Sequence, residues 1–350
     1  MKKILIIQNK FIGDVIYSTI YFEFIKQKYP NAKIHYLICD AARAAVLNHP
    51  LLDRVIIYPD SKTNEFLGLV KLIISLRANT YDAVIDVYGK LNSLLVSVLV
   101  KSKNTIAYRK WYSQLFYSKT FKRHKNSEYQ SSLAIENRLK LLGLLGIDYN
   151  PNILPKIFLT DDEINTTKAY LSLSGIDFNR PLLMICIFGS KPSKSYPMAY
   201  MVEVIEAVAG MGNYQLLLNY APSQKADMEQ LYDQCTPRTQ ALIAKKVYGK
   251  SLRQLISISH CCSAVIGNDG GPINIAKALG VPSFAIFSPD LNKVNWYGQN
   301  EKDKHIAVHL NDYMSQERIR KQGHIEEKYN LFKPYLFNNE LSNFLSRLAL

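Results

Sequence analysis

The chain has 350 residues, of which 48% are apolar and 21% are charged. This length and apolar content predict two folded domains, and they exclude both a single small module and an extended disordered polymer. The 43 Lys and Arg residues outnumber the 29 Asp and Glu residues, and the formal charge of +14 favours anionic partners such as nucleic acid, a phospholipid surface or a phosphorylated substrate.

The cysteine and histidine patterns give little support to a disulfide framework or to a metal site. The five cysteines are odd in number and scattered, and a bridge between the adjacent Cys261 and Cys262 would be awkward. Neither a Cys-x-x-Cys pair nor a His-Glu-x-x-His motif occurs in the sequence. We therefore expect no disulfide scaffold and no bound metal.

The start of the chain predicts neither a signal peptide nor a membrane span. Its apolar run is only four residues long before Gln8 and Asn9, which is too short for a signal peptide. No run of about 20 apolar residues occurs in the sequence. We expect a cytoplasmic protein that touches a membrane only at its face.

The first half of the chain alternates short apolar runs with amphipathic segments. Strands are predicted at 3–7, 34–38, 54–58 and 83–87. Helices are predicted at 15–29, 66–76 and 131–145, the last ending at Gly146 as a C-terminal glycine should. This alternation predicts parallel strands joined by crossover helices, and we assign residues 1–150 to an N-terminal Rossmann-like domain.

A linker and a second series of the same kind follow. Residues 149–155 contain two prolines, and Thr160 and Glu163 form a helix-capping signature just after them. Strands are predicted at 182–188, 215–218, 264–266 and 283–287. Helices are predicted at 199–209, 224–235, 252–259 and 273–279. The fold class is therefore α/β, with two doubly wound domains whose ligands are expected in the cleft between them, beyond the carboxyl ends of the strands.

The domain limits follow from this organisation. We assign residues 156–325 to a C-terminal Rossmann-like domain. The remaining residues 326–350 form a C-terminal segment that we expect to pack back on the N-terminal domain.

The first candidate site is the turn after the first predicted strand. Gly13 would permit close backbone approach, and Asp14 follows it at the start of a helix that points into the cleft. Asp14 could act as a general base toward a hydroxyl group, or it could only cap the helix, and a capping role would weaken it as a base. The position alone does not decide between these roles.

The second candidate is the segment 188–197, just past the first strand of the second half. Ser190, Lys191 and Lys194 at the carboxyl end of a strand could clamp a diphosphate, with lysine as a mobile point charge. The P-loop pattern is absent, and a solvated basic loop is the alternative interpretation.

The third and most specific candidate is the segment 266–282. A strand ends in Gly-Asn-Asp-Gly-Gly, Pro272 lies in the first turn of the next helix, and Gly280 closes that helix. Free backbone amides beside Gly270 and Gly271 would form an anion site for a diphosphate. Asp269 is better suited to sugar hydroxyls, and a purely structural tight turn is the alternative.

These three segments, in this order and spacing, resemble glycosyltransferase family nine, the ADP-heptose:lipopolysaccharide heptosyltransferases. The stretches Tyr-Asp-Ala-Val-Ile-Asp at 81–86 and Gly-Lys-Ser-Leu-Arg-Gln-Leu at 249–255 also resemble that family, as does the Asp-x-Gly-Pro to Ala-Leu-Gly-x-Pro stretch. The resemblance covers nearly the whole chain. It implies a GT-B fold and an inverting, metal-independent transfer without a cofactor. It also implies that residues 156–325 bind the nucleotide-sugar donor and that residues 1–150 bind the acceptor.

The resemblance also implies roles for individual residues. It implies that Asp14 is the base, that Lys194 binds the donor phosphates and that Ser190 supplies a phosphate-binding hydroxyl. It places the adenine of the donor near the backbone around Lys250, and the donor sugar and diphosphate at Asp269, Gly270 and Gly271. The expected donor site therefore consists of Ser190, Lys194, Lys250, Asp269, Gly270 and Gly271.

Two departures from the family pattern lie on the donor side. Asn274 stands where many members have His, and Ser223 and Gln224 stand where an acidic residue is expected after the strand that ends at Leu218. These departures leave the identity of the nucleotide sugar open.

The segment between Asp86 and Glu128 is basic and aromatic and contains no acidic residue. Its cations and aromatic rings, among them Arg109, Lys110 and Trp111, could bind an acidic glycolipid acceptor whose carboxylates and phosphates need cations. A solvated basic face is an alternative interpretation. Single-stranded nucleic acid is another, although none of the recognised RNA-binding motifs is present.

The sequence therefore predicts a glycosyltransferase at the cytoplasmic face of the inner membrane, a peripheral protein that moves heptose from ADP-heptose to the lipopolysaccharide inner core. No nucleic-acid partner is expected. Transfer of another sugar, such as N-acetylglucosamine, and a non-catalytic sugar-nucleotide or glycolipid-binding protein are the rival hypotheses.

Overall fold

The computed structural model describes residues 1–59 and 65–348, and it divides the chain into two units. The first unit consists of Met1–Phe158 together with Val294–Asn300. The second unit consists of Leu159–Lys293 and Glu301–Leu350. Within the described residues, no helix combines the length and the apolar character that crossing a bilayer requires.

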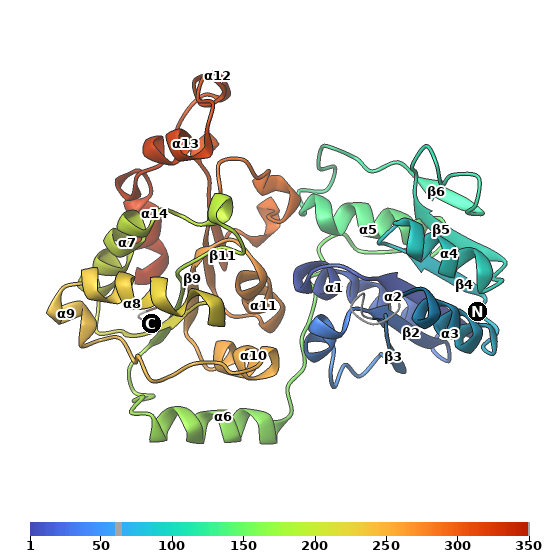
Figure 1. Ribbon diagram of the computed structural model, residues 1–350, viewed down its shortest axis with the longest axis horizontal. Helices are drawn as coiled ribbons and strands as arrows, with labels where there is room; N and C mark the ends of the chain where they lie inside the picture. Colours follow the sequence, from blue (N-terminus) through green and yellow to red (C-terminus); the bar gives the residue numbers. More distant parts are fainter. Residues whose placement is uncertain (60–64, 349–350) are drawn as a thin grey trace. The chain divides into compact units, whose positions relative to one another are not determined.

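The first unit is built on a six-stranded parallel sheet (Figure 1). The strand order is β3-β2-β1-β4-β5-β6. The strands are β1 Lys3–Gln8, β2 Lys33–Ile38, β3 Arg54–Ile57, β4 Ala83–Asp86, β5 Asn104–Tyr108 and β6 Lys119–Phe121. The helices are α1 Ile12–Ser18, α2 Ile20–Lys28, α3 Glu65–Arg77, α4 Leu91–Leu99 and α5 Leu133–Gly143, with the 3₁₀ helix η1 at Asp40–Ala45.

Residues 4–7 of β1 are all apolar, as expected for a strand whose sheet has helices on both faces. Its residues Ile4 and Ile6 belong to the core beneath α1, α2 and α5. Leu5 and Ile7 belong to the core beneath α3 and α4, which pack against each other. Residues along a strand alternate between its two faces, so this one strand contributes to both cores.

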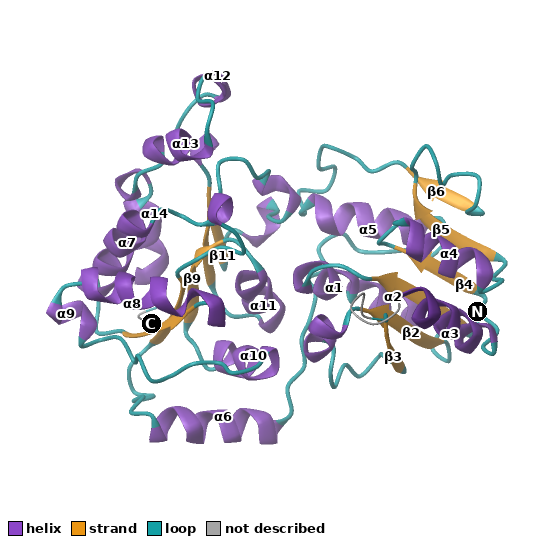
Figure 2. Ribbon diagram, in the orientation of Figure 1, coloured by secondary structure: helices purple, strands orange, loops and turns teal. Residues whose placement is uncertain are grey.

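The second unit has a five-stranded parallel sheet with the order β11-β10-β9-β7-β8 (Figure 2). Its strands are β7 Leu182–Cys186, β8 Gln215–Asn219, β9 Ala264–Asn268, β10 Ser283–Ile286 and β11 His305–Val308. Its helices are α6 Asp161–Leu173, α7 Met198–Gly210, α8 Lys225–Gln234, α9 Pro237–Gln240, α10 Leu252–His260, α11 Gly271–Leu279, α12 Gln316–Arg320, α13 Ile325–Leu331 and α14 Asn338–Ser346.

The C-terminal segment 326–350 packs on a different domain from the one predicted. We expected residues 326–350 to pack on the N-terminal domain, but they belong to the second unit. Phe337 and Phe344 contact Phe284 of β10, with ring centroids 6.0 and 5.7 Å apart. The apolar positions of α14 therefore complete the core of the unit that precedes them in sequence.

A different segment, 294–300, returns to the first unit. The rings of Trp296 and Tyr17 meet edge to face with centroids 5.1 Å apart, and the Tyr17 hydroxyl donates to the Trp296 carbonyl oxygen at 3.3 Å. The amide of Gln299 donates to the Gln130 carbonyl oxygen at 2.6 Å. Gly298 leaves no room for a Cβ there, since such an atom would lie 2.6 Å from that same oxygen.

The boundary between the two units also differs from the predicted one. The first unit continues to Phe158, whereas the predicted domains end at residue 150 and begin at residue 156.

Several elements of the first unit were not predicted. Helix α4 and the strands β5 and β6 fall in or beside the basic segment, where charged residues interrupt the apolar pattern. The helix predicted at 15–29 is divided at Thr19 into α1 and α2.

Gly267 allows β9 to approach β7 closely. Its φ is +125°, and a Cβ at this position would lie 2.4 Å from the Cys186 carbonyl oxygen. We expect Gly267→Ala to lower the midpoint of thermal unfolding by about 5 °C or more, because strain and steric overlap act together. Gly210→Ala is the matched control, since nothing lies within 4 Å of its added Cβ, and it should leave the midpoint unchanged or raise it slightly. Equal midpoints for both variants would contradict the close approach.

Candidate functional site

Asp14 lies in the first turn of α1, directly after the loop that follows β1. The N-cap residue of this helix is Phe11, and it makes no side-chain capping bond. The side chain of Asp14 contacts cations instead. The capping interpretation is therefore not what the structure shows, and Gly13 beside it is a buried residue of the same helix.

Arg138 of α5 fixes the Asp14 carboxylate. The guanidinium donates to Asp14 Oδ1 at 2.9 Å and to the Ser18 hydroxyl at 3.1 Å. Burial opposes the charge of Arg138, but Asp14 and the neighbouring tyrosines outweigh it, so the pKa of Arg138 lies above its usual value. The second oxygen, Oδ2, lies 3.7 Å from the half-exposed Lys10 ammonium. One carboxylate oxygen is thus held in place while the other faces a mobile cation.

Sequence reasoning missed Arg138, because the ion pair joins residues 124 positions apart. The available signal was an arginine inside the leucine-rich helix α5, where its side chain is 6% exposed. A buried arginine needs an acidic or carbonyl partner, and that requirement alone pointed to a carboxylate elsewhere in the fold.

In the second unit, the predicted donor residues Ser190 and Lys194 follow β7, and Asp269, Gly270 and Gly271 follow the adjacent strand β9, whereas Lys250 precedes α10. The side chain of Asn268 joins two of these strand ends. Its Nδ2 donates to the carbonyl oxygens of Cys186 and Ile187 at 3.1 and 3.0 Å, and its Oδ1 accepts from the Tyr196 amide at 2.6 Å. The loop after β7 and the loop after β9 are therefore held next to each other, at the point where the strand order reverses.

The loop after β7 is closed on itself at Gly189. A Cβ on this residue would lie 2.3 Å from the Lys194 carbonyl oxygen, so only glycine fits. The Gly189 amide donates to Ser195 Oγ at 3.0 Å. This turn leaves Lys194 half-buried, while Ser190 and Lys191 are exposed. The two lysines of the predicted clamp therefore have different surroundings.

Gln224 braces the same turn. Its Nε2 donates to the Gly189 carbonyl oxygen at 3.0 Å, and its Oε1 accepts from the Ala221 amide at 2.8 Å. Gln224, which departs from the family pattern at this position, thus has a structural role: its side-chain amide links the loop after β8 to the loop after β7.

Asp269 is a half-buried residue whose carboxylate oxygen Oδ1 is itself buried. Among the described residues, none offers a hydrogen bond to its Oδ1. Burial raises the pKa of Asp269 to about 6, against the opposing effect of the nearby Lys277 and Lys194. The Asn274 Oδ1, on the next helix α11, is likewise buried without a partner in the described part of the chain. Two acceptor oxygens therefore lie close together in sequence and await donors.

The ion pair of Lys277 and Glu301 lies beside this carboxyl. The Lys277 ammonium is 2.5 Å from Glu301 Oε2, and both side chains are almost completely buried. Burial lowers the pKa of Lys277, although Glu301 and Asp269 act in the opposite sense. Sequence reasoning missed both residues: Lys277 lies within the segment 266–282 but was not singled out there, and Glu301 belongs to no recognisable motif.

Gly270 and Gly271 leave space in front of α11. Gly270 is extended with φ at 171°, so its backbone does not require glycine. A Cβ on Gly271 would meet nothing within 4 Å, and one on Gly270 would meet only Pro272 at 3.9 Å. The tight-turn interpretation therefore lacks a steric basis, and the glycines give open access to the first amides of a nine-residue helix.

Lys250 is exposed in the loop before α10, and its amide donates to Gln254 Oε1 at 2.9 Å. Two tyrosines that the sequence analysis did not single out lie near this loop. The rings of Tyr220 and Tyr248 stack with centroids 4.8 Å apart and an interplanar angle of 32°. They provide an aromatic wall after β8.

The three predicted acceptor residues of the basic segment share the loop between β5 and β6. Arg109 is exposed and donates from Nε to Thr120 Oγ1 at 3.3 Å. Trp111 is 87% exposed. Lys110 is different, because its ammonium donates to the Gly89 carbonyl oxygen and so anchors the loop beside the start of α4.

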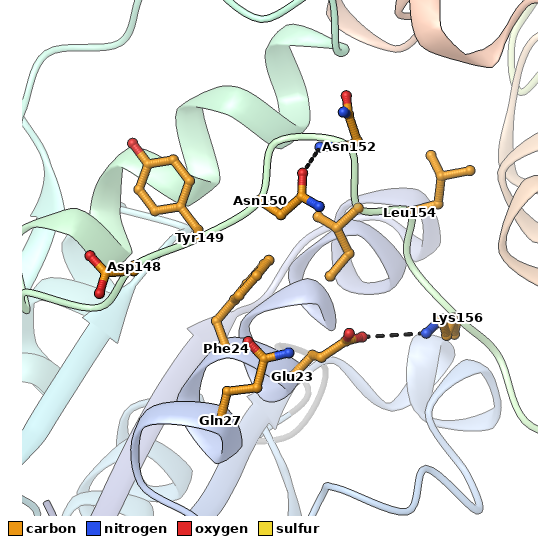
Figure 3. Close-up of a pocket in the computed structure, with 10 residues that line it drawn as sticks. Glu23, Phe24, Gln27, Asp148, Tyr149, Asn150, Asn152, Leu154 and Lys156 are labelled. Atoms are coloured by element: carbon orange, nitrogen blue, oxygen red, sulfur yellow. Dashed lines mark hydrogen bonds and ion pairs between the residues drawn. The ribbon is translucent and has the colours of Figure 1, made fainter.

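A pocket of about 600 Å³ lies elsewhere in the first unit, between α2 and residues 148–156 (Figure 3). Glu23 and Lys156 form an ion pair of 3.4 Å at its edge. None of the predicted site residues lines this pocket, which is a groove beneath the linker. Within the described residues, no group of three or more His, Cys, Asp or Glu side chains is placed to hold a metal ion.

Comparison with known proteins gives a family match. Residues 69–326 match the model of glycosyltransferase family 9 (heptosyltransferase). The matched residues include the loops after β7 and β9 but not Asp14. The chain is similar to lipopolysaccharide heptosyltransferase 1 of Campylobacter coli, with 26% identity over 81% of this chain and 83% of the relative. It is also similar to lipopolysaccharide heptosyltransferase 2 of Escherichia coli K12, with 24% identity over 82% and 83%.

Solved structures confirm the predicted GT-B fold class. A family 9 glycosyl transferase from Veillonella parvula superposes with a TM-score of 0.82 at 20% identity, covering 99% of this chain and 97% of that chain. The E. coli ADP-heptose lipopolysaccharide heptosyltransferase II superposes with a TM-score of 0.75 at 20% identity, covering 100% of both chains. The family resemblance inferred from the sequence motifs is likewise confirmed.

The raised pKa of Asp269 makes a prediction about stability and pH. In the unfolded chain the carboxyl loses its proton near pH 4, whereas in the folded chain it holds the proton to about pH 6. The folded state thus binds more protons across this interval, and rising pH favours unfolding. Between pH 4 and 7 the wild type should lose about 2 to 3 kcal/mol of unfolding free energy relative to Asp269→Asn. Chemical denaturation of both proteins at a series of pH values measures it, and parallel curves would contradict it.

Proposed function

Because the chain belongs to glycosyltransferase family 9, the heptosyltransferase family, we propose that it transfers heptose from ADP-heptose to the inner core of lipopolysaccharide with inversion at the anomeric carbon. The observation that carries the donor side is the arrangement after β7 and β9. There the half-buried Lys194, the open amides of α11 and the unpartnered oxygen of Asp269 lie around one strand-order reversal. Such an arrangement suits a diphosphate joined to a sugar.

In the proposed reaction an acceptor hydroxyl attacks the anomeric carbon of the donor. The bond between that carbon and the diphosphate oxygen breaks, and ADP leaves with the electron pair. Asp14 takes the hydroxyl proton on Oδ2, the oxygen that Arg138 does not hold. Arg138 acts as a positioning residue, because it keeps the carboxylate in one orientation.

The leaving diphosphate gains negative charge as the bond breaks. Lys194 and the first amides of α11, beside Gly270 and Gly271, would stabilise that charge without a metal ion. Ser190 would add a hydroxyl contact. Asp269 and Asn274 would accept hydrogen bonds from sugar hydroxyls, which accounts for two buried oxygens that would otherwise cost free energy.

The adenine of the donor would lie against the loop that contains Lys250. Tyr220 and Tyr248 supply an aromatic wall there for a planar base. Thermal-shift measurements with ADP-heptose, UDP-N-acetylglucosamine and GDP-mannose test the donor: ADP-heptose should give the largest rise in unfolding temperature. A larger rise with UDP-N-acetylglucosamine would replace heptose by that sugar.

On the acceptor side, Arg109 and Trp111 are the exposed members of the predicted set. The proposal assigns the phosphates or carboxylates of the core to Arg109 and an apolar or sugar face to Trp111. Lys110 would position their loop through its bond to Gly89. We also propose that the chain works as a peripheral protein at the cytoplasmic face of the membrane that carries the acceptor.

Asp14→Asn tests the base. An amide oxygen can still accept the hydrogen bond from Arg138, so folding and donor affinity should change little, while turnover should fall by on the order of 10² or more. Steady-state kinetics and calorimetric titration with ADP separate the two effects. Asp148→Asn, an exposed carboxylate beside the pocket of Figure 3, is the control and should retain turnover. Wild-type turnover of Asp14→Asn would exclude this residue as the base.

Lys194→Ala should raise the dissociation constant of the donor and also slow the chemical step, because the charge that it contacts grows as the diphosphate leaves. Lys191→Ala is the matched control, since this lysine lies three residues away in the same loop and is exposed. Its effect on kcat should be small. Small and equal effects at both positions would mean that the loop is only a solvated basic surface.

A further inference from the structure

The outer surfaces of α3 and α4 are apolar. The described part of the chain has eighteen large apolar side chains that are exposed, and eleven of them lie between residues 66 and 116. On α3 they are Phe66, Leu67, Val70 and Ile74, and on α4 they are Leu91, Leu95, Val98 and Leu99. The opposite sides of both helices are already buried in the core above β1 and β4. A surface helix normally has a polar outer side, so these two helices depart from that pattern.

The loop between β5 and β6 extends this surface. Its side chains Trp111, Leu115 and Phe116 are exposed, and Leu115 is 90% exposed. The loop is fixed beside α4, because Tyr117 packs with Leu94 and donates to the buried Asp86 at 2.6 Å. Helices α3 and α4 also pack against each other (Figure 1). We call these eleven side chains on α3, α4 and the loop the α3–α4 face.

Positive charge accompanies the α3–α4 face. Residues 66–127 contain eleven Lys and Arg residues but only two acidic residues, Asp82 and Asp86. Asp82 accepts hydrogen bonds from the amides of Lys2 and Lys3, and Asp86 is buried. Exposed lysines flank the helices: Lys71 is on α3, Lys90 precedes α4, and Lys101 and Lys103 follow it.

We propose that the α3–α4 face binds the surface of a bilayer that contains anionic phospholipid. Apolar side chains would enter the boundary between headgroups and acyl chains, while the flanking lysines would contact lipid phosphates. A second copy of the chain fits less well, because a symmetric pair would bring two basic surfaces together. The inference deepens the proposed function, which needs an acceptor held in a membrane, but it can be tested on vesicles that contain no acceptor.

Two variants separate the apolar and the ionic contributions. The apolar variant combines Ile74→Ser, Leu95→Ser and Leu115→Ser, all at exposed positions, and the charge variant combines Lys71→Glu and Lys103→Glu. The wild type should float with vesicles of phosphatidylcholine mixed with phosphatidylglycerol, and less with phosphatidylcholine alone. The apolar variant should bind the mixed vesicles about tenfold or more weakly at every salt concentration. The charge variant should lose binding mainly at low salt, where the ionic attraction is strongest.

Matched controls use the second unit. Leu173→Ser removes another side chain that is 90% exposed, and Lys168→Glu with Lys302→Glu reverses two exposed lysines. These variants should bind vesicles like the wild type. Calorimetric titration with ADP should give one affinity for all the variants, which shows that they are folded and keeps this test separate from that of the transferase proposal.

The proposal is overturned if the wild type does not float with the mixed vesicles, or if the apolar variant floats as well as the wild type. It is also overturned if the wild type is a dimer in solution that the apolar variant dissociates, without any vesicle binding. In that case the α3–α4 face is an interface between copies of the chain.

Discussion

The side chain of Asn268 is the contact on which the candidate donor site depends. Its three hydrogen bonds reach the end of β7 and the start of the segment after the Gly189 turn. A buried amide with both ends satisfied is rigid, and its loss would remove one hydrogen-bond partner from each of three backbone groups. Gly267 just before it permits the close approach of β9 to β7. Lys194 and Asp269 come near each other because these two residues hold their loops together.

The carboxyl groups of the two candidate site residues, Asp14 and Asp269, have opposite surroundings. Asp14 has a buried cation at 2.9 Å, which fixes its orientation. Asp269 is half-buried, and its Oδ1 is buried with no hydrogen-bond partner among the described residues; its pKa is raised to about 6 because desolvation exceeds the influence of two lysines. A buried acceptor without a donor costs free energy. The cost is recovered when a ligand supplies a hydroxyl, so such an atom fits a binding role better than a structural one.

How much the sequence could predict depends on whether the determining interaction is local. The segment 266–282 was predictable, because a strand, a glycine pair, a proline in the first helical turn and Gly280 at the helix end obey backbone rules within 17 residues. The open space at Gly270 and Gly271 agrees with that prediction. Residues such as Arg138 and Glu301 could not be placed, since their partners are set by tertiary packing. Lys110 was assigned to the acceptor for its charge, whereas its partner in the fold is the Gly89 carbonyl oxygen.

The sequence also did not predict which segment of the second half of the chain belongs to the first unit. The stretch 294–300 lies 136 residues after the linker at Phe158, and its contacts with Tyr17 and Gln130 arise from shape rather than from any pattern of residues. From the sequence, a crossing of this kind is expected at 326–350 instead. That segment has apolar positions at helical spacing, and such a pattern indicates only that a helix face is buried, not which core buries it.

The apolar character of the α3–α4 face does not follow from the fold alone, because a helix on the opposite face of the same sheet has a polar outer side. On its other face, the outer positions of α2 are occupied by Glu23, Lys26, Gln27 and Lys28, and the apolar residues of that helix are buried. Both faces cover the same strands and need the same inner residues, as the alternation of Ile4, Leu5, Ile6 and Ile7 between the two cores shows. Core packing therefore explains the inner sides of α3 and α4 but not their outer sides. Only one of the two helical layers has an outer surface that is apolar and bordered by lysines. A partner that binds this surface best explains the difference.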